Sequence, residues 1–127
     1  MPSRRVFKTK TFDRWARKLV DDAALCVAAR EIEAGLYEAD LGAGLCKKRI
    51  ATFGRGKRAS IRTLVAKKNV HAVIFLAGRE KSAPGADFSE TEVAVAKNIA
   101  KGLEQADVVM LERLMAVGAL KEMCDDE

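Results

Sequence analysis

Cysteine, histidine and proline are scarce in this chain of 127 residues, which contains three cysteines, one histidine and two prolines. Cys26, Cys46 and Cys124 are scattered, odd in number and never spaced as Cys-x-x-Cys. The sequence therefore favours neither a disulfide framework nor a zinc site. We expect reduced cysteines and a protein that uses no metal and no other cofactor.

The sequence also lacks a long apolar run. No stretch approaches the roughly 18 residues that a membrane span requires, and no apolar stretch of a signal peptide follows the charged residues 1–7. We therefore expect a cytoplasmic protein that does not contact a membrane. The length, with 49% hydrophobic residues, is typical of a single domain over residues 1–127.

Hydrophobic spacing in the N-terminal third predicts a short strand over residues 6–8, followed by two helices. Thr11 can cap the first helix, and Asp21 and Asp22 begin the second, which Gly35 ends. In both helices the apolar residues recur at helical spacing and so define one buried face.

The remainder of the chain predicts a meander of strands and then two helices. A glycine-rich turn at 41–45 precedes segments rich in Ile, Val, Thr and Phe, and the connections between these segments are short enough for hairpins. Ser89 and Glu92 form a capping box for one helix, and Asp107 begins the last. The fold class is α+β, with N-terminal helices packed on a small antiparallel sheet and C-terminal helices after it. The expected strands are 48–53, 60–66 and 70–76, and the expected core contains Phe12, Trp15, Leu25, Ile32, Ile50, Leu64, Val73 and Phe75.

Positive charge is concentrated in the middle of the chain. Between residues 47 and 81 there are eleven Lys or Arg residues and a single acid, Glu80. Such a density indicates a polyanionic partner, because clustered cations displace the counterions condensed on phosphates. A solvated charged face is the alternative, but the basic residues fall on expected strands, which favours nucleic acid. The candidates are Lys47, Lys48, Arg49, Arg55, Lys57, Arg58, Arg62, Arg79 and Lys81.

These residue types are chemically able to cleave RNA without a metal. When the ribose 2′-OH attacks the adjacent phosphorus, the reaction needs a proton acceptor, a proton donor for the leaving oxygen, and cations for the phosphate oxygens. Arginine suits only the last role, because its guanidinium stays protonated. Lysine can act as a base where neighbouring cations depress its pKa. Many RNA-binding proteins with the same composition cut nothing.

Other possible sites are weaker. The Gly-Arg-Gly-Lys run at 54–57 lacks the spacing of a phosphate-binding loop and is interpreted as a hairpin turn. His71 lies in an apolar strand and is interpreted as a structural residue. Cys46 follows no pattern of a nucleophile, although the neighbouring Lys47 could lower its pKa.

Residues 39–51 form a distinctive run, Ala-Asp-Leu-Gly-Ala-Gly-Leu-Cys-Lys-Lys-Arg-Ile-Ala. This run resembles the most recognisable motif of a RelE/HigB-like toxin subfamily. Residues 54–57 and 62–64 resemble its next block, residues 7–17 its start, and residues 111–122 its final helix and tail. The resemblance spans nearly the whole chain.

The resemblance implies a bacterial toxin that cuts messenger RNA in the ribosomal A site. It implies Lys57, Arg62 and Lys81 as catalytic residues, with the other basic candidates binding RNA. It also implies an antitoxin encoded alongside, often with a DNA-binding helix-turn-helix. We expect the antitoxin segment that binds the toxin to be acidic, and the N-terminal cations Arg4, Arg5, Lys8 and Lys10 to widen its landing surface.

The chain departs from the subfamily at two blocks. Residues 57–62 are Lys-Arg-Ala-Ser-Ile-Arg where members usually have Lys-Ser-Gly-Gly-aromatic-Arg. Residues 78–82 are Gly-Arg-Glu-Lys-Ser where members have Gly-Phe-Ala-Lys-Asn. The alternative function is therefore a non-catalytic module, a degenerate toxin that binds RNA or its partner. Inhibition of a DNA topoisomerase, as in ParE-like relatives, fits the retained basic motifs less well.

Overall fold

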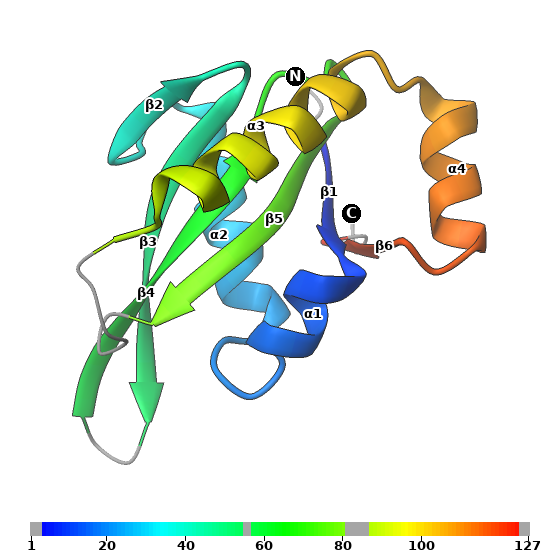
Figure 1. Cartoon of the computed structure of the whole chain (residues 1–127). Coiled ribbons are helices and arrows are strands. Elements are labelled where there is room, and N and C mark those ends of the chain that lie inside the picture. The colour runs from blue at the N-terminus through cyan, green and yellow to red at the C-terminus, as the bar shows by residue number, and fades with distance from the viewer. Residues whose placement is uncertain (1–3, 55–56, 81–86, 125–127) are drawn as a thin grey trace.

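The computed structural model describes residues 4–54, 57–80 and 87–124, with the backbone alone at residues 53–54 and 57–59. The chain is α+β, with a six-stranded sheet and four helices in the described part (Figure 1). The elements in chain order are β1 (Arg5–Thr9), α1 (Lys10–Ala16), α2 (Asp22–Glu33), β2 (Ala39–Gly42), β3 (Leu45–Gly54), β4 (Lys57–Ala66), β5 (Ala72–Glu80), α3 (Glu90–Glu104), α4 (Val108–Ala116) and β6 (Leu120–Met123).

The sheet is mixed, with the strand order β2-β3-β4-β5-β1-β6. The three expected strands are present as β3, β4 and β5 and form antiparallel neighbours. The expectation of a wholly antiparallel sheet is wrong, because β1 inserts between β5 and β6 and runs parallel to β5. The short strands β2 and β6 were not expected, since four residues carry too little alternation to be noticed.

Helix starts follow the local capping chemistry. Asp21, Ser89 and Asp107 cap α2, α3 and α4 as expected, and Ser89 and Glu92 form the full capping box. The first helix begins earlier than predicted, because Thr9, not Thr11, accepts the hydrogen bond of the Phe12 N–H. Each cap accepts a hydrogen bond from a backbone N–H of the first turn and so fixes where the helix begins.

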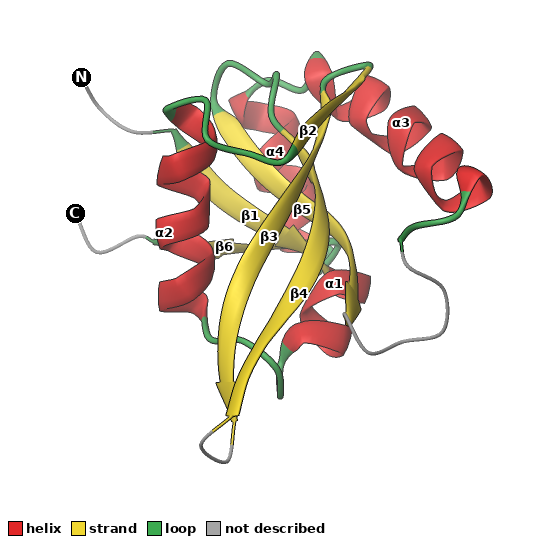
Figure 2. Ribbon diagram, turned by 90° about the vertical axis from the view of Figure 1, so that its left-hand side faces the viewer, coloured by secondary structure: helices red, strands yellow, loops and turns green. Residues whose placement is uncertain are grey.

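Two hydrophobic clusters lie on opposite faces of the sheet. Helices α1 and α2 cover one face, and α3 and α4 contribute to the cluster on the other (Figures 1 and 2). Seven of the eight expected core residues are buried, and Trp15 is half-buried. The Trp15 indole lies against the backbone of β5, where a Cβ on Gly78 would stand 1.9 Å from the indole Cζ3. Only glycine fits at that point of β5.

Cys26 of α2 and Cys124, which follows β6, form a disulfide with their Cα atoms 5.8 Å apart. The expectation of reduced cysteines is therefore wrong for this pair. The pairing could not be predicted from the sequence, because the two cysteines are 98 residues apart and only the folded sheet brings α2 beside the end of β6. Within the described residues, no helix has the length and apolarity needed to cross a membrane.

Candidate functional site

Three arginines lie side by side across three neighbouring strands. Arg49 of β3 is directly opposite Arg62 of β4, and Arg62 is directly opposite Arg79 of β5. Residues paired in this way project from the same face of a sheet. Arg49 is exposed, whereas Arg62 and Arg79 are half-buried. Lys47, two residues before Arg49, belongs to the same face.

Lys47, Arg49 and Arg62 line one pocket of about 260 Å³, which we call the basic pocket. Two carboxylates, Glu38 and Asp87, line it as well. The Lys47 ammonium forms an ion pair with Asp87, and the backbone N–H of Arg49 donates to Glu38 Oε1 at 2.5 Å. The pocket therefore presents cationic side chains that are partly offset by internal acids.

Asp87 is held in its ionised form. The hydrogen bond from Lys47 lowers the pKa of the Asp87 carboxyl, and the N–H of Phe88 and the charge of Arg62 act in the same direction. Neither Asp87 nor Glu38 could be predicted as a site residue from the sequence, because neither residue belongs to a motif. They become visible only when the segments before β2 and α3 fold beside β3.

A family model described as the RelE toxin of the RelE / RelB toxin-antitoxin system matches residues 4–123. The chain belongs to the RelE toxin family. No curated protein and no solved structure matches it. Membership in this family implies an antitoxin partner.

Lys48 of this RelE-family toxin does not join the basic pocket. Its side chain is only 8% exposed, forms an ion pair with Glu31 at 2.9 Å and donates to the Leu36 carbonyl at 2.9 Å. It lies on the opposite face of β3, beneath α2, because successive strand residues alternate between faces. Its expected contact with RNA is corrected to a structural role.

The other expected site residues fall outside the described side chains. Arg55 and Lys81 lie outside the described residues, and the side chains of Lys57 and Arg58 are not described. The backbone of Lys57 begins β4 and is paired with Gly54. The roles of these four residues therefore remain predictions from the sequence.

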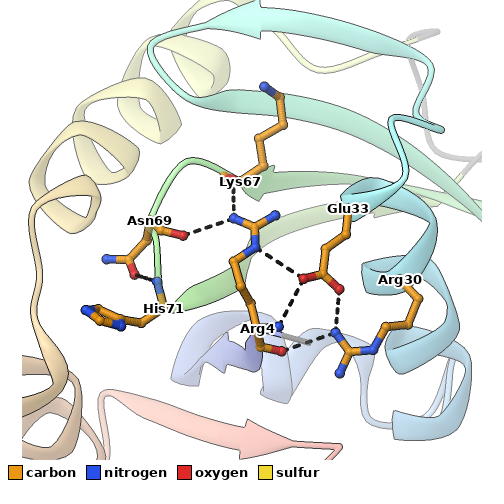
Figure 3. A network of polar contacts seen from close by, with 6 residues as sticks. All are labelled: Arg4, Arg30, Glu33, Lys67, Asn69 and His71. Atoms are coloured by element: carbon orange, nitrogen blue, oxygen red, sulfur yellow. Dashed lines mark hydrogen bonds and ion pairs between the residues drawn. The ribbon is translucent and has the colours of Figure 1, made fainter. Parts of the chain in front are cut away.

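Three N-terminal cations of the toxin are engaged within the fold. The Arg4 guanidinium donates to the carbonyls of Lys67 at 2.6 Å and Asn69 at 2.9 Å, and it pairs with Glu33 (Figure 3). Arg5 pairs with acids near the C-terminus. Lys8 is buried between Asp13 and Asp22, each at 2.7 Å. Lys8, with a side chain only 6% exposed, therefore adds nothing to a landing surface for an acidic partner, whereas that role of Arg4, Arg5 and Lys10 stays a prediction from the sequence.

The remaining candidate groups offer no separate chemistry. Burial raises the pKa of the Cys46 thiol to about 12, which opposes formation of a nucleophilic thiolate at this position. In the part of the chain that the structure describes, no group of three or more His, Cys, Asp or Glu side chains could hold a metal ion. The basic pocket is therefore the strongest candidate site among the described residues.

Proposed function

We propose that this RelE-family toxin is a ribosome-dependent endoribonuclease that cuts messenger RNA in the cytoplasm. The observation that carries the proposal is the convergence of Lys47, Arg49 and Arg62 on one pocket, with Arg79 next in the cross-strand row. A phosphodiester placed there would receive hydrogen bonds from two guanidinium groups and one ammonium group. Arginine is well suited to this task, because its planar fork matches two phosphate oxygens at once.

The proposed reaction is an in-line attack by the RNA itself. The ribose 2′-oxygen loses its proton to a base and bonds to the adjacent phosphorus, while the bond from phosphorus to the 5′-oxygen breaks and that oxygen gains a proton. The products are a 2′,3′-cyclic phosphate and a 5′-hydroxyl. Arg62 and Arg49 would stabilise the charge that develops on the phosphate oxygens. From the family resemblance, we assign proton transfer to Lys57 and Lys81.

Asp87 and Glu38 have a clear role in this proposal. In the free protein they neutralise part of the positive charge of the basic pocket, and Asp87 orients Lys47. An incoming phosphate would compete with Asp87 for the Lys47 ammonium. The toxin would therefore bind RNA more weakly than the number of its cations suggests, and the ribosome would supply the missing positioning of the message.

These internal acids also favour a second function, in which the pocket binds RNA or a partner without cutting. Expression of the chain in a bacterium without its antitoxin separates the two. Growth arrest with cleaved messages supports the endoribonuclease, whereas unimpaired growth supports the binding module. The key variant is Arg62→Ala, which we expect to relieve toxicity. The matched control is Lys101→Ala, an exposed cation of α3, which should remain toxic.

A further inference from the structure

The outer half of β3 is an edge strand in the described structure. Strand β2 pairs with β3 only from Leu45 to Lys47, with Ala39 opposite Lys47. Beyond Lys47, β3 continues to Gly54, and it pairs there with β4 alone among the described strands. In Figure 2 the β3–β4 arm extends well past β2. An open strand edge of this kind is a template for pairing with another chain.

The backbone direction at this edge can be derived from two hydrogen bonds. The Lys47 carbonyl accepts the Glu38 N–H at 2.9 Å, so it faces the β2 side. Two residues further on, the Arg49 N–H donates to the Glu38 carboxylate on the same side. Because strand groups alternate, the N–H and carbonyl of the exposed Ala51 also face this side. The Glu38 carboxylate thus occupies the place where a paired strand would present a carbonyl.

An apolar groove runs beside the same edge. It has a volume of about 490 Å³ and lies between α2 and β3. Its apolar lining comes from Ala24, Val27, Ala28, Ile50 and Ala51, and Glu31, Glu38, Arg49 and Ser60 complete it. Val27 is 60% exposed at its wall, although it is a large apolar side chain on an otherwise amphipathic helix. Arg49 and Glu38 line both this groove and the basic pocket, so the two sites adjoin.

We propose that an extended, acidic segment of the antitoxin adds as a strand to the β3 edge at Arg49 and Ala51 and displaces the Glu38 carboxylate from the Arg49 N–H. Its side chains would alternate between faces. Those on the Arg49 face would be carboxylates directed at Arg49 and the basic pocket. Those on the Ile50 face would be apolar and would enter the groove beneath α2. The inference rests on the antitoxin partner that the family implies, and it does not require the toxin to cut RNA.

Charge favours this occupant over a second copy of the chain. The formal net charge is +5, and edge-to-edge pairing of two copies would bring two basic pockets together. Like charges opposed across a strand pair are destabilising. An acidic strand would instead neutralise Arg49 and its neighbours, and the same carboxylates would obstruct access of a phosphate to the pocket.

Synthetic peptides test the proposal directly. The probe is a labelled ten-residue peptide of alternating Glu and Val, measured by fluorescence anisotropy with the full chain. In two further peptides the backbone nitrogens of all Glu residues or of all Val residues are methylated. Each of these peptides therefore lacks the N–H donors along one of its two edges. If the peptide adds as a strand, one methylated peptide loses binding and the other keeps it. Methylation of the Glu residues should abolish binding if the peptide runs antiparallel to β3, and methylation of the Val residues should abolish it if the peptide runs parallel. Equal binding of both methylated peptides, or no saturable binding of the parent peptide, overturns the proposal.

Variants of the chain locate the binding site. Ala51→Pro removes only an N–H that points away from the sheet, and edge strands tolerate such a substitution. It should weaken binding of the peptide about tenfold. Ala51→Val keeps the N–H and should bind normally. Val27→Glu places a carboxylate in the groove and should also weaken binding, whereas Val70→Glu, the same change at an exposed loop residue, should not. Binding that is insensitive to both Ala51→Pro and Val27→Glu overturns the proposal.

Two other occupants would give different results. If the edge pairs with a second copy, sedimentation will show a dimer that Ala51→Pro dissolves. If the edge binds RNA, Ala51→Pro will weaken the binding of a single-stranded RNA oligonucleotide and leave the binding of the peptide unchanged. Either result overturns the proposal, and neither decides whether the toxin cuts RNA.

Discussion

Arg49 and Arg62 lie directly opposite one another on β3 and β4, on the face of the sheet that carries the basic pocket. Like charges in this arrangement repel, typically by about 0.2–1 kcal/mol. Glu38 and Asp87 offset part of the repulsion from within the pocket. The free protein therefore retains two adjacent guanidinium groups that a bound phosphate could bridge.

Replacing Arg62 by Gln should relieve this repulsion without opening a cavity. We expect the free energy of unfolding to stay constant or to rise by up to about 1 kcal/mol. The rate of RNA cleavage should fall. Urea denaturation of the two proteins measures the change. A loss of stability above about 2 kcal/mol would mean that Arg62 is primarily a structural residue.

Lys47 and Lys48 are sequence neighbours whose substitution should have opposite consequences. Lys48→Ala removes a buried ammonium and its bonds to Glu31 and Leu36, so we expect a loss of about 1–3 kcal/mol of stability. Lys47→Ala breaks an ion pair near the surface and should cost less than about 1 kcal/mol. RNA affinity should fall for Lys47→Ala alone. Unfolding curves and anisotropy with an RNA oligonucleotide test both, and the reverse pattern would contradict the assignment of faces.

The Cys26–Cys124 disulfide should contribute to stability by tying α2 to the end of β6. Closing a loop of this length typically contributes about 2–5 kcal/mol in small domains. We expect the double variant Cys26→Ser/Cys124→Ser to unfold at lower urea concentration than the oxidised chain. A thiol count on the unreduced, denatured protein is the control: one thiol, from Cys46, agrees with the structure, and three thiols contradict it.

Asp13 should make stability depend on acid pH. Hydrogen bonds from Lys8 and then Arg17 lower the pKa of the Asp13 carboxyl to about 2 in the folded protein, against about 3.9 in an unfolded chain. A depressed folded-state pKa stabilises the protein above the unfolded pKa, and this contribution is lost as the pH falls from about 4 to about 2. Asp13→Asn should flatten this part of the profile of unfolding free energy against pH. Identical slopes in the two proteins would contradict the ion pair with Lys8.

Much of the fold could be predicted from the sequence, because its signals are local. The caps at Asp21, Ser89 and Asp107 and the β-branched segments of the meander specify their elements without help from distant residues. The parallel insertion of β1 and the Cys26–Cys124 bond depend on contacts across most of the chain. Hydrophobic spacing alone gives no information on such pairings.

The site could be predicted only in part for a related reason. The basic character of residues 47–62 is evident in the sequence, but strand parity decides which cations reach the pocket. It separates Lys47 and Arg49 from Lys48, and that separation becomes clear once the register with β4 is known. Glu38 and Asp87 lie in loops that line the pocket and belong to no sequence motif, so their place in the site could not be predicted.

The proposed endoribonuclease activity can be measured as cleavage of a defined messenger RNA on purified, programmed ribosomes. The wild-type toxin should cut within the A-site codon and leave a 2′,3′-cyclic phosphate and a 5′-hydroxyl. Arg62→Ala should reduce the single-turnover rate by about a hundredfold, and Lys101→Ala should leave it unchanged. An uncut message with the wild-type toxin would contradict the proposed activity, and equal rates for wild type and Arg62→Ala would contradict the proposed role of Arg62.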